Sequence, residues 1–240
     1  MNPRIYLFVS ICCLLLSCED KEQKLLDLRA SQLENISEFG ATPLHDEFQK
    51  ASEELATKVE AFTQAPDLNQ LQAVREQWKS VGQLFKRCEL YDIGEVNSSF
   101  IHYRIHRWPT NEGRMEDSLA ASSALTMEKV SNLGSSLVGL ASLEYLLFEN
   151  DADQTLEQFQ ASPRRLEYLL LCSQYLSNQA AELNKIWKSY SPTYVTSLQS
   201  AIIGGQNQSI NSLVSFMEET SKTRLGKAMG EDDGGNTDST

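Results

Sequence analysis

A single carboxylate, Glu144, lies in an apolar stretch near the middle of this 240-residue chain. Residues 139–148 read Gly-Leu-Ala-Ser-Leu-Glu-Tyr-Leu-Leu-Phe, a pattern that predicts a helix. A charged carboxylate is costly to bury unless it is paired, hydrogen-bonded or coordinated to a metal ion. Glu144 therefore needs a partner that this stretch does not contain, which makes it the first candidate for a binding site.

An arginine is one kind of partner for Glu144. Arg87, Arg104 and Arg107 occur on other predicted segments, and an ion pair with one of them would make Glu144 a packing residue. A bound cation or ligand is the other kind. Both interpretations remain open from the residues alone.

Two histidines offer a second metal-binding pattern. His102 and His106 are four residues apart on a predicted short helix, and this spacing can chelate a metal ion from one helical face. Arg104 and Arg107 stand beside them and disfavour a cation, so we expect a surface or ligand-facing pair. His45, near a helix start, is expected to be solvated.

Other chemistry has little support. The sequence shows no His-Glu-x-x-His, no Gly-x-Ser-x-Gly and no Gly-rich phosphate loop, which argues against hydrolysis and nucleotide binding. Cys88 and Cys172 have apolar neighbours and are expected to be small core residues, although an oxidising compartment would permit a disulfide between them.

The N-terminus predicts export and lipidation. Residues 1–17 contain Arg4 and then an apolar run that is too short to span a bilayer, which is typical of a secretory signal. The ending Leu-Leu-Ser-Cys resembles a bacterial lipobox, in which Cys18 carries the acyl chains that anchor the protein to a membrane. A cleaved signal with an incidental Cys18 and an N-terminal membrane helix are the alternatives.

The charge balance limits the partners. The chain has 21 basic and 33 acidic residues and a formal net charge of −12, and removal of Arg4 with the signal makes it −13. Such an acidic protein is a poor binder of nucleic acid, so no nucleic-acid partner is expected. The acidic residues after Cys18 resemble a signal for the outer face of the outer membrane.

Apolar residues recur at helical spacing, and no β-rich interval is visible, so we predict an all-α protein. Residues 18–40 are predicted to be a tether that becomes helical and is interrupted at Gly40. Thr42 and Pro43 would then start a helix that ends near residue 65, and Asp67 with Gln70 would start an antiparallel partner. Further helices are predicted near residues 97–107, 116–130, 137–149, 163–190, 194–203 and 206–228, with a short segment at 156–159, a loop at Trp108-Pro109, a stop at Ser191-Pro192 and a disordered acidic tail at 230–240.

Residues 139–148 resemble the signature helix of the imelysin-like family, Gly-x-His-x-x-Glu followed by Tyr-Leu-Leu and a large aromatic. In that family the His and Glu are suspected metal ligands, and here the His position is Ala141. Residues 78–94 and 105–113 are similar to two other family blocks, as are Trp187 and residues 209–230. The resemblance implies up-and-down helical bundles in a domain at 41–229. Family members usually continue further, so a second bundle is expected to be incomplete.

The resemblance also implies a site. Glu89, at the end of the helix that carries Trp78, and Glu144 would meet between helices and bind a divalent metal or iron, with Asp92 as a further carboxylate. Loss of the imidazole at Ala141 weakens selectivity for transition metals. Arg107 and Trp108 are expected to shape the mouth of the cleft and contact the ligand.

The expected function follows from the family. The chain resembles an envelope lipoprotein, held at the outer membrane on its periplasmic or surface side, that captures a metal or small ligand without catalysis and serves iron or related nutrient acquisition. An outer-membrane uptake system would be its partner. A metallopeptidase and a helical interaction module of a surface assembly, without a metal, are the alternatives.

Overall fold

The computed structural model describes residues 21, 23–196, 214, 215, 217 and 218. Every regular element in these residues is helical, which confirms the all-α fold class. The elements that carry bounds are, in chain order, the π-helical turn η1 (Ile36–Ala41), α2 (Thr42–Gln64), α3 (Leu68–Cys88), the 3₁₀ turn η2 (Glu89–Tyr91), α4 (Gly94–Ser98), α5 (Ile101–Ile105), α6 (Glu112–Ala120), α7 (Met127–Ser131), the 3₁₀ turn η3 (Ser135–Leu137), α8 (Gly139–Phe148), α9 (Ala152–Ala161) and α10 (Pro163–Thr196).

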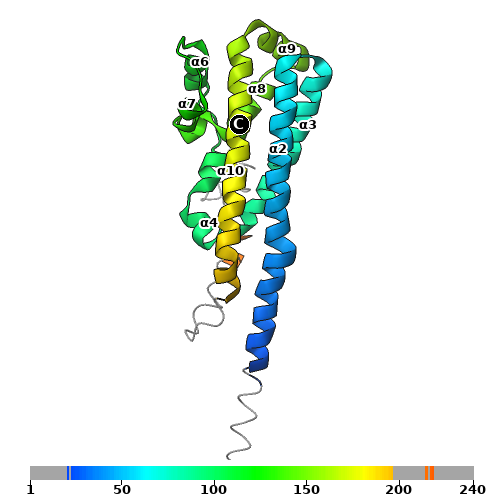
Figure 1. The fold of residues 1–240 in the computed structure, drawn as a ribbon, viewed down its shortest axis with the longest axis vertical. Coiled ribbons are helices and arrows are strands. Elements are labelled where there is room, and N and C mark those ends of the chain that lie inside the picture. Colours follow the sequence, from blue (N-terminus) through cyan, green and yellow to red (C-terminus); the bar gives the residue numbers. More distant parts are fainter. Residues whose placement is uncertain (1–20, 22, 197–213, 216, 219–240) are drawn as a thin grey trace, which may run out of the picture.

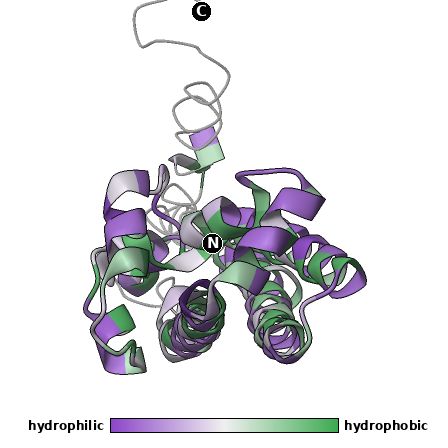
Figure 2. Cartoon of the chain, turned by 90° about the horizontal axis from the view of Figure 1, so that it is seen from above, coloured by the Kyte–Doolittle hydropathy of each residue, from purple (hydrophilic) through white to green (hydrophobic). Residues whose placement is uncertain are grey.

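Three long helices form the frame of the molecule. In Figure 1, α2 lies between α3 and α10, while α6 and α7 lie on the far side of α10. Figure 2 looks along these helices, and each carries both hydrophobic and hydrophilic residues, as amphipathic packing requires. The largest fully buried side chains include Phe48, Phe62, Phe85, Phe159, Tyr168, Trp187 and Tyr194.

The predicted apolar seams of α2 and α3 are confirmed. The α2 series with steps of three and four is buried throughout, from Leu44 to Phe62. At the start of α3, Asp67 accepts a hydrogen bond from the backbone N–H of Gln70 at 2.8 Å, as the cap pattern predicts. The two helices pack along their length, so their apolar seams face one core.

The predicted interruption at Gly40 is wrong. Residues 23–35 are helical and continue through η1 directly into α2, and the residue before α2 makes no side-chain cap. The wider π-helical turn precedes Pro43, which has no backbone N–H to donate. Gly40 has a packing role instead, because a Cβ atom there would lie 2.6 Å from the hydroxyl oxygen of Tyr91.

Two predicted helices are each divided. The helix expected at 97–107 is split into α4 and α5 by Phe100, whose φ of +54° is left-handed and cannot continue a helix. The helix expected at 116–130 is split into α6 and α7. The short segment expected at 156–159 is part of the longer α9, which Asp151 caps by accepting from the N–H of Gln154 at 2.9 Å.

The predicted stop at Ser191-Pro192 is also wrong, because α10 continues to Thr196. Pro192 cannot donate to the carbonyl of Lys188, but the Ser191 hydroxyl donates to that oxygen at 3.4 Å. Tyr194 is fully buried, with its ring centroid 5.8 Å from that of Trp187. This packing keeps the last turns of α10 on the bundle.

His45 is buried, contrary to the expectation that it is solvated. Its ring stacks parallel on Trp187 with 5.2 Å between centroids, and Nδ1 lies 2.7 Å from the carbonyl oxygen of Ala41. Burial lowers the pKa of His45 to about 4, so the ring is neutral near pH 7. The prediction failed because α10 covers a side of α2 that the apolar spacing of α2 does not identify.

The two core cysteines behave as predicted from their neighbours. Cys88 and Cys172 are buried and free, so the alternative disulfide does not form. Burial raises the pKa of both thiols. The predictions for residues 1–17, Cys18 and the tail at 230–240 lie outside the described residues, as do most of 194–203 and 206–228.

Candidate functional site

Glu144 lies on the wall of a cleft of about 890 Å³ between α3, α8 and the segment that follows α5. The volume is typical of a site for a small molecule. One wall is the side of α3 that adjoins its buried seam. The lining residues are Trp78, Lys79, Gly82, Gln83, Lys86, Arg87, His106, Trp108, Leu140 and Glu144.

The N-terminal end of α8 is set by Gly139. Its φ is +77°, and a Cβ atom there would lie 2.8 Å from the carbonyl oxygen of Arg104 and closer still to that of Ile105. Only glycine allows both this backbone conformation and this approach. The end of α5 is therefore packed directly on the start of the helix that carries Glu144.

Two side chains of α3 hold the rest of α8. Trp78 donates from Nε1 to the carbonyl oxygen of Leu140 at 3.0 Å. The buried Arg75 donates from Nε to the carbonyl of Leu147 at 2.7 Å, and its Nη2 reaches Thr155 Oγ1 at 3.1 Å. The helix is thus fixed at both ends, and the position of Glu144 relative to α3 follows from these contacts.

The carboxylate of Glu144 is half-buried, and burial raises its pKa above the ordinary value. No hydrogen bond or ion pair between described residues involves this group. Arg87 lines the same cleft, whereas Arg104 donates to the carbonyl of Ser99 and Arg107 lies over the ring of Tyr103. The structure therefore shows no arginine ion pair that would make Glu144 a packing residue.

The other charged residues that line the cleft are basic. Lys79, Lys86 and Arg87 stand against the one acid, Glu144. Lys79 is 3.1 Å from Glu76 Oε1 and Lys86 is 2.9 Å from Glu89 Oε2, whereas the exposed Arg87 forms no ion pair with a described residue. Burial, with the charge of Lys86 as a second cause, lowers the pKa of His106 to about 4, so its imidazole is neutral at pH 7.

Glu89 lines a different pocket from Glu144. It is 7 % exposed and borders a narrow space of about 10 Å³ together with Asp92 and His102. There Asp92 Oδ2 lies 3.1 Å from His102 Nδ1. The metal site shared by Glu89 and Glu144 stays a prediction, and the geometry adds that the two acids border separate spaces.

The histidine pair is divided as well. α5 ends at Ile105, and His106 follows with φ −148° and ψ 97°, which is extended backbone. His102 therefore faces the narrow pocket with Asp92, whereas His106 turns into the cleft with Glu144. The four-residue spacing predicts a shared helical face only if the helix continues, and here it does not.

A family model for imelysin, Peptidase M75, matches residues 41–239. The chain belongs to the imelysin family. No curated protein matches the sequence at a significant level.

Two solved structures share the imelysin fold with this chain. An imelysin-like protein from Psychrobacter arcticum 273-4 has 23% sequence identity and a TM-score of 0.69, over 84% of this chain and 64% of that one. A candidate iron-regulated protein A precursor from Parabacteroides distasonis ATCC 8503 has 19% identity and a TM-score of 0.72, over 88% of this chain and 64% of that one. The alignments thus span less than two thirds of either neighbour.

The donor set of this imelysin-family chain does not suit a resident metal ion in the cleft. Ala141, at the position of the signature histidine, is buried and offers a methyl group. Glu144 and His106 are carboxylate and imidazole donors on the wall, and the guanidinium of Arg87, which has no ion pair with a described residue, opposes a bare metal ion there. Within the described residues, no three His, Cys, Asp or Glu side chains form a group that could hold a metal ion.

Of the two residues predicted at the mouth, Trp108 lines the cleft and Arg107 does not. Sequence reasoning missed Lys79, Gly82 and Lys86. Their spacing of three and four residues puts them on one face of α3, and a glycine inside a strongly helical segment was the available signal. No helix in the described part of the chain is both long and apolar enough to cross a membrane.

Proposed function

We propose that the cleft captures a small anionic ligand with an apolar body, and that the protein serves iron or related nutrient acquisition without catalysis. A ferric ion held in an anionic chelate fits both the proposed anionic ligand and the proposed role in iron acquisition. In such a complex most metal ligands come from the captured molecule, so the protein needs to supply few of its own.

The charge inside the cleft carries this proposal. Lys79 and Lys86 are each paired with a glutamate outside the cleft lining, Glu76 and Glu89, which leaves Arg87 as the basic lining residue without an ion pair to a described residue. A cation without a carboxylate partner attracts an anionic ligand, and a cleft focuses this attraction. Arg87 is the strongest candidate contact, because its guanidinium can bind a carboxylate through two hydrogen bonds.

The apolar lining and the two titratable groups complete the site. Trp78, Trp108 and Leu140 provide faces for an aromatic or aliphatic body. His106 is neutral at pH 7 and keeps a nitrogen lone pair that can coordinate a metal ion arriving with the ligand. Glu144 with its raised pKa can donate a hydrogen bond when protonated or accept one when ionised.

The cellular setting is part of the same proposal. Cys18 would carry the lipid anchor of an envelope protein at the outer membrane, and an outer-membrane uptake system would receive the ligand. The name of the structural neighbour from Parabacteroides distasonis refers to iron regulation, which supports the nutrient role. Two assays test the anchor: retention of the protein in detergent extracts and labelling with radioactive palmitate. We expect both to be lost in Cys18→Ala.

Tryptophan fluorescence tests the ligand class, because Trp78 and Trp108 line the cleft whereas Trp187 is fully buried. The purified protein is titrated with ferric citrate, with citrate and with zinc chloride. We expect saturable binding of ferric citrate, and at least fivefold weaker binding in Arg87→Gln, which loses a charged hydrogen-bond donor. Arg114→Gln removes an exposed arginine outside the cleft and is the matched control.

The other functions correspond to other outcomes. Tight binding of zinc chloride that is lost in Glu144→Gln would replace the chelate with a resident metal. Chelator-sensitive cleavage of unfolded protein would indicate the metallopeptidase. If neither ferric citrate nor citrate binds, and Arg87→Gln changes nothing, the proposal of anionic capture is refuted and the interaction module is favoured.

A further inference from the structure

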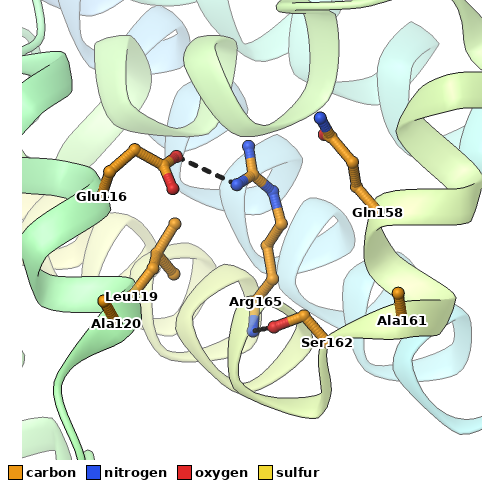
Figure 3. Close-up of a pocket in the computed structure, with 7 residues that line it drawn as sticks. All are labelled: Glu116, Leu119, Ala120, Gln158, Ala161, Ser162 and Arg165. Atoms are coloured by element: carbon orange, nitrogen blue, oxygen red, sulfur yellow. Dashed lines mark hydrogen bonds and ion pairs between the residues drawn. The ribbon is translucent and has the colours of Figure 1, made fainter.

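A second pocket, of about 360 Å³, lies between α6 and the junction of α9 with α10, and it shares no residue with the cleft. Figure 3 shows Arg165 at its centre, between Glu116 on one side and Gln158 on the other. Leu119, Ala120 and Ala161 form apolar walls. The pocket is therefore small and has both polar and apolar lining groups.

Arg165 does not use all of its N–H donors. The residue is 7 % exposed, and its terminal nitrogens are bound to Glu116 Oε1 at 3.0 Å and Glu149 Oε2 at 3.1 Å. Its Nε is buried and has no hydrogen-bond partner. The side-chain oxygen of Gln158, Oε1, is also buried and without a partner. A buried donor or acceptor that stays unpaired is costly, so this arrangement favours a ligand that pairs both.

We propose that this pocket binds a neutral amide group. The amide carbonyl accepts from Arg165 Nε–H, and the amide N–H donates to Gln158 Oε1. Because both atoms are covered in the free protein, the Gln158 side chain rotates to admit the ligand, and its three side-chain torsions and half-buried position allow this movement.

The charges select an amide over a carboxylate. Arg165 is already neutralised by Glu116 and Glu149, so a second anion at its Nε would meet two carboxylates. A bare cation would meet the guanidinium. A neutral group that offers one acceptor and one donor avoids both repulsions, and the three apolar side chains suit a methyl-sized neighbour.

The test observes the donor itself. In the ¹⁵N-labelled full chain, the Arg165 Nε–H signal is followed by NMR during titration with propionamide, and with propionate as the anionic counterpart. We expect a saturable shift of this signal with the amide and at least tenfold weaker binding of the acid. Gln158→Ala should weaken amide binding about fivefold through loss of one hydrogen bond, while Gln154→Ala, exposed on the same helix, should leave it unchanged.

Two sources of the amide are distinguished by a capped tri-alanine peptide. Binding more than tenfold tighter than that of propionamide assigns the pocket to an extended polypeptide, and equal binding assigns it to small amides. The proposal is overturned if the Nε–H signal does not respond to the amide, if the acid binds as well as the amide, or if Gln158→Ala binds as tightly as the unaltered chain.

Discussion

Replacement of Gly139 by alanine tests the packing of α8 against α5. The added methyl group would lie 2.8 Å from the carbonyl oxygen of Arg104 and nearer to that of Ile105, and neither backbone oxygen can move without moving the end of α5. The residue would also keep a φ of +77°, which L-residues rarely adopt. The same methyl group at Gly82, in the middle of α3, meets nothing within 4 Å and provides a matched control.

The expected loss has two parts. A left-handed conformation costs alanine about 1–2 kcal/mol, and overpacking against fixed backbone costs about 1–3 kcal/mol. Reduced freedom of the unfolded chain returns about 0.4–1 kcal/mol. Gly139→Ala should therefore lower the free energy of unfolding by about 2–4 kcal/mol, whereas Gly82→Ala should raise it by about 0.5–1 kcal/mol through helix propensity.

Urea unfolding followed by far-ultraviolet circular dichroism measures both values. Both variants add one methyl group to a glycine, yet the expected changes in the free energy of unfolding have opposite signs. The comparison therefore separates the effect of the site from that of the added methyl group. If Gly139→Ala were as stable as the unaltered chain, or stabilised to the degree of Gly82→Ala, the contact between α5 and α8 would be refuted as the reason for glycine at this position.

Three further predictions concern the frame. Arg75→Met should lower the free energy of unfolding by about 2–4 kcal/mol, because the carbonyl of Leu147 and its neighbours lose a buried donor, and urea titration measures this. Between pH 7 and pH 4.5 the chain should lose about 2–3 kcal/mol of stability through His45: its folded pKa of about 4 lies below the unfolded value of 6.5, so the unfolded state binds more protons as the pH falls. Urea titrations at both pH values should show a smaller loss in His45→Gln. Pro192→Ala should raise the free energy of unfolding by about 1–3 kcal/mol by restoring a helical N–H, which thermal unfolding can measure.

A different result would contradict each of these three predictions. Arg114→Met, on the surface, should change stability by less than about 0.5 kcal/mol, and an equal effect at Arg75 would deny it a structural role. If His45→Gln loses as much stability on acidification as the unaltered chain, His45 is not neutral in the folded protein. A destabilised Pro192→Ala would show that the proline is favourable where it stands.

The regular parts of the fold were predictable from the sequence. The apolar spacing of α2, α3 and α10 and the cap at Asp67 are local signals, and the structure confirms them. The errors at Gly40 and Pro192 have a different origin. At each position a residue that disfavours a helix is overruled by tertiary packing, against Tyr91 in one case and around Tyr194 in the other.

The candidate site was predictable only in part. Glu144 was identified as an acid in an apolar helix and Trp108 through the family resemblance, and both line the cleft. The contribution of His106 depends on where α5 ends, which is fixed by the packing of Gly139 and not by the spacing of the two histidines. The basic face of α3 becomes a wall only because α8 is placed opposite to it.

The attachment of α8 through its backbone has a consequence for how this family can diversify. The contacts at Gly139, Leu140 and Leu147 are made by main-chain atoms, so none of them depends on the side chain at position 141 or 144. A lineage can therefore exchange the chemistry of the signature helix, as the alanine at 141 illustrates, while the architecture persists. The main-chain contacts that hold α8 can persist while the side chains at positions 141 and 144 change.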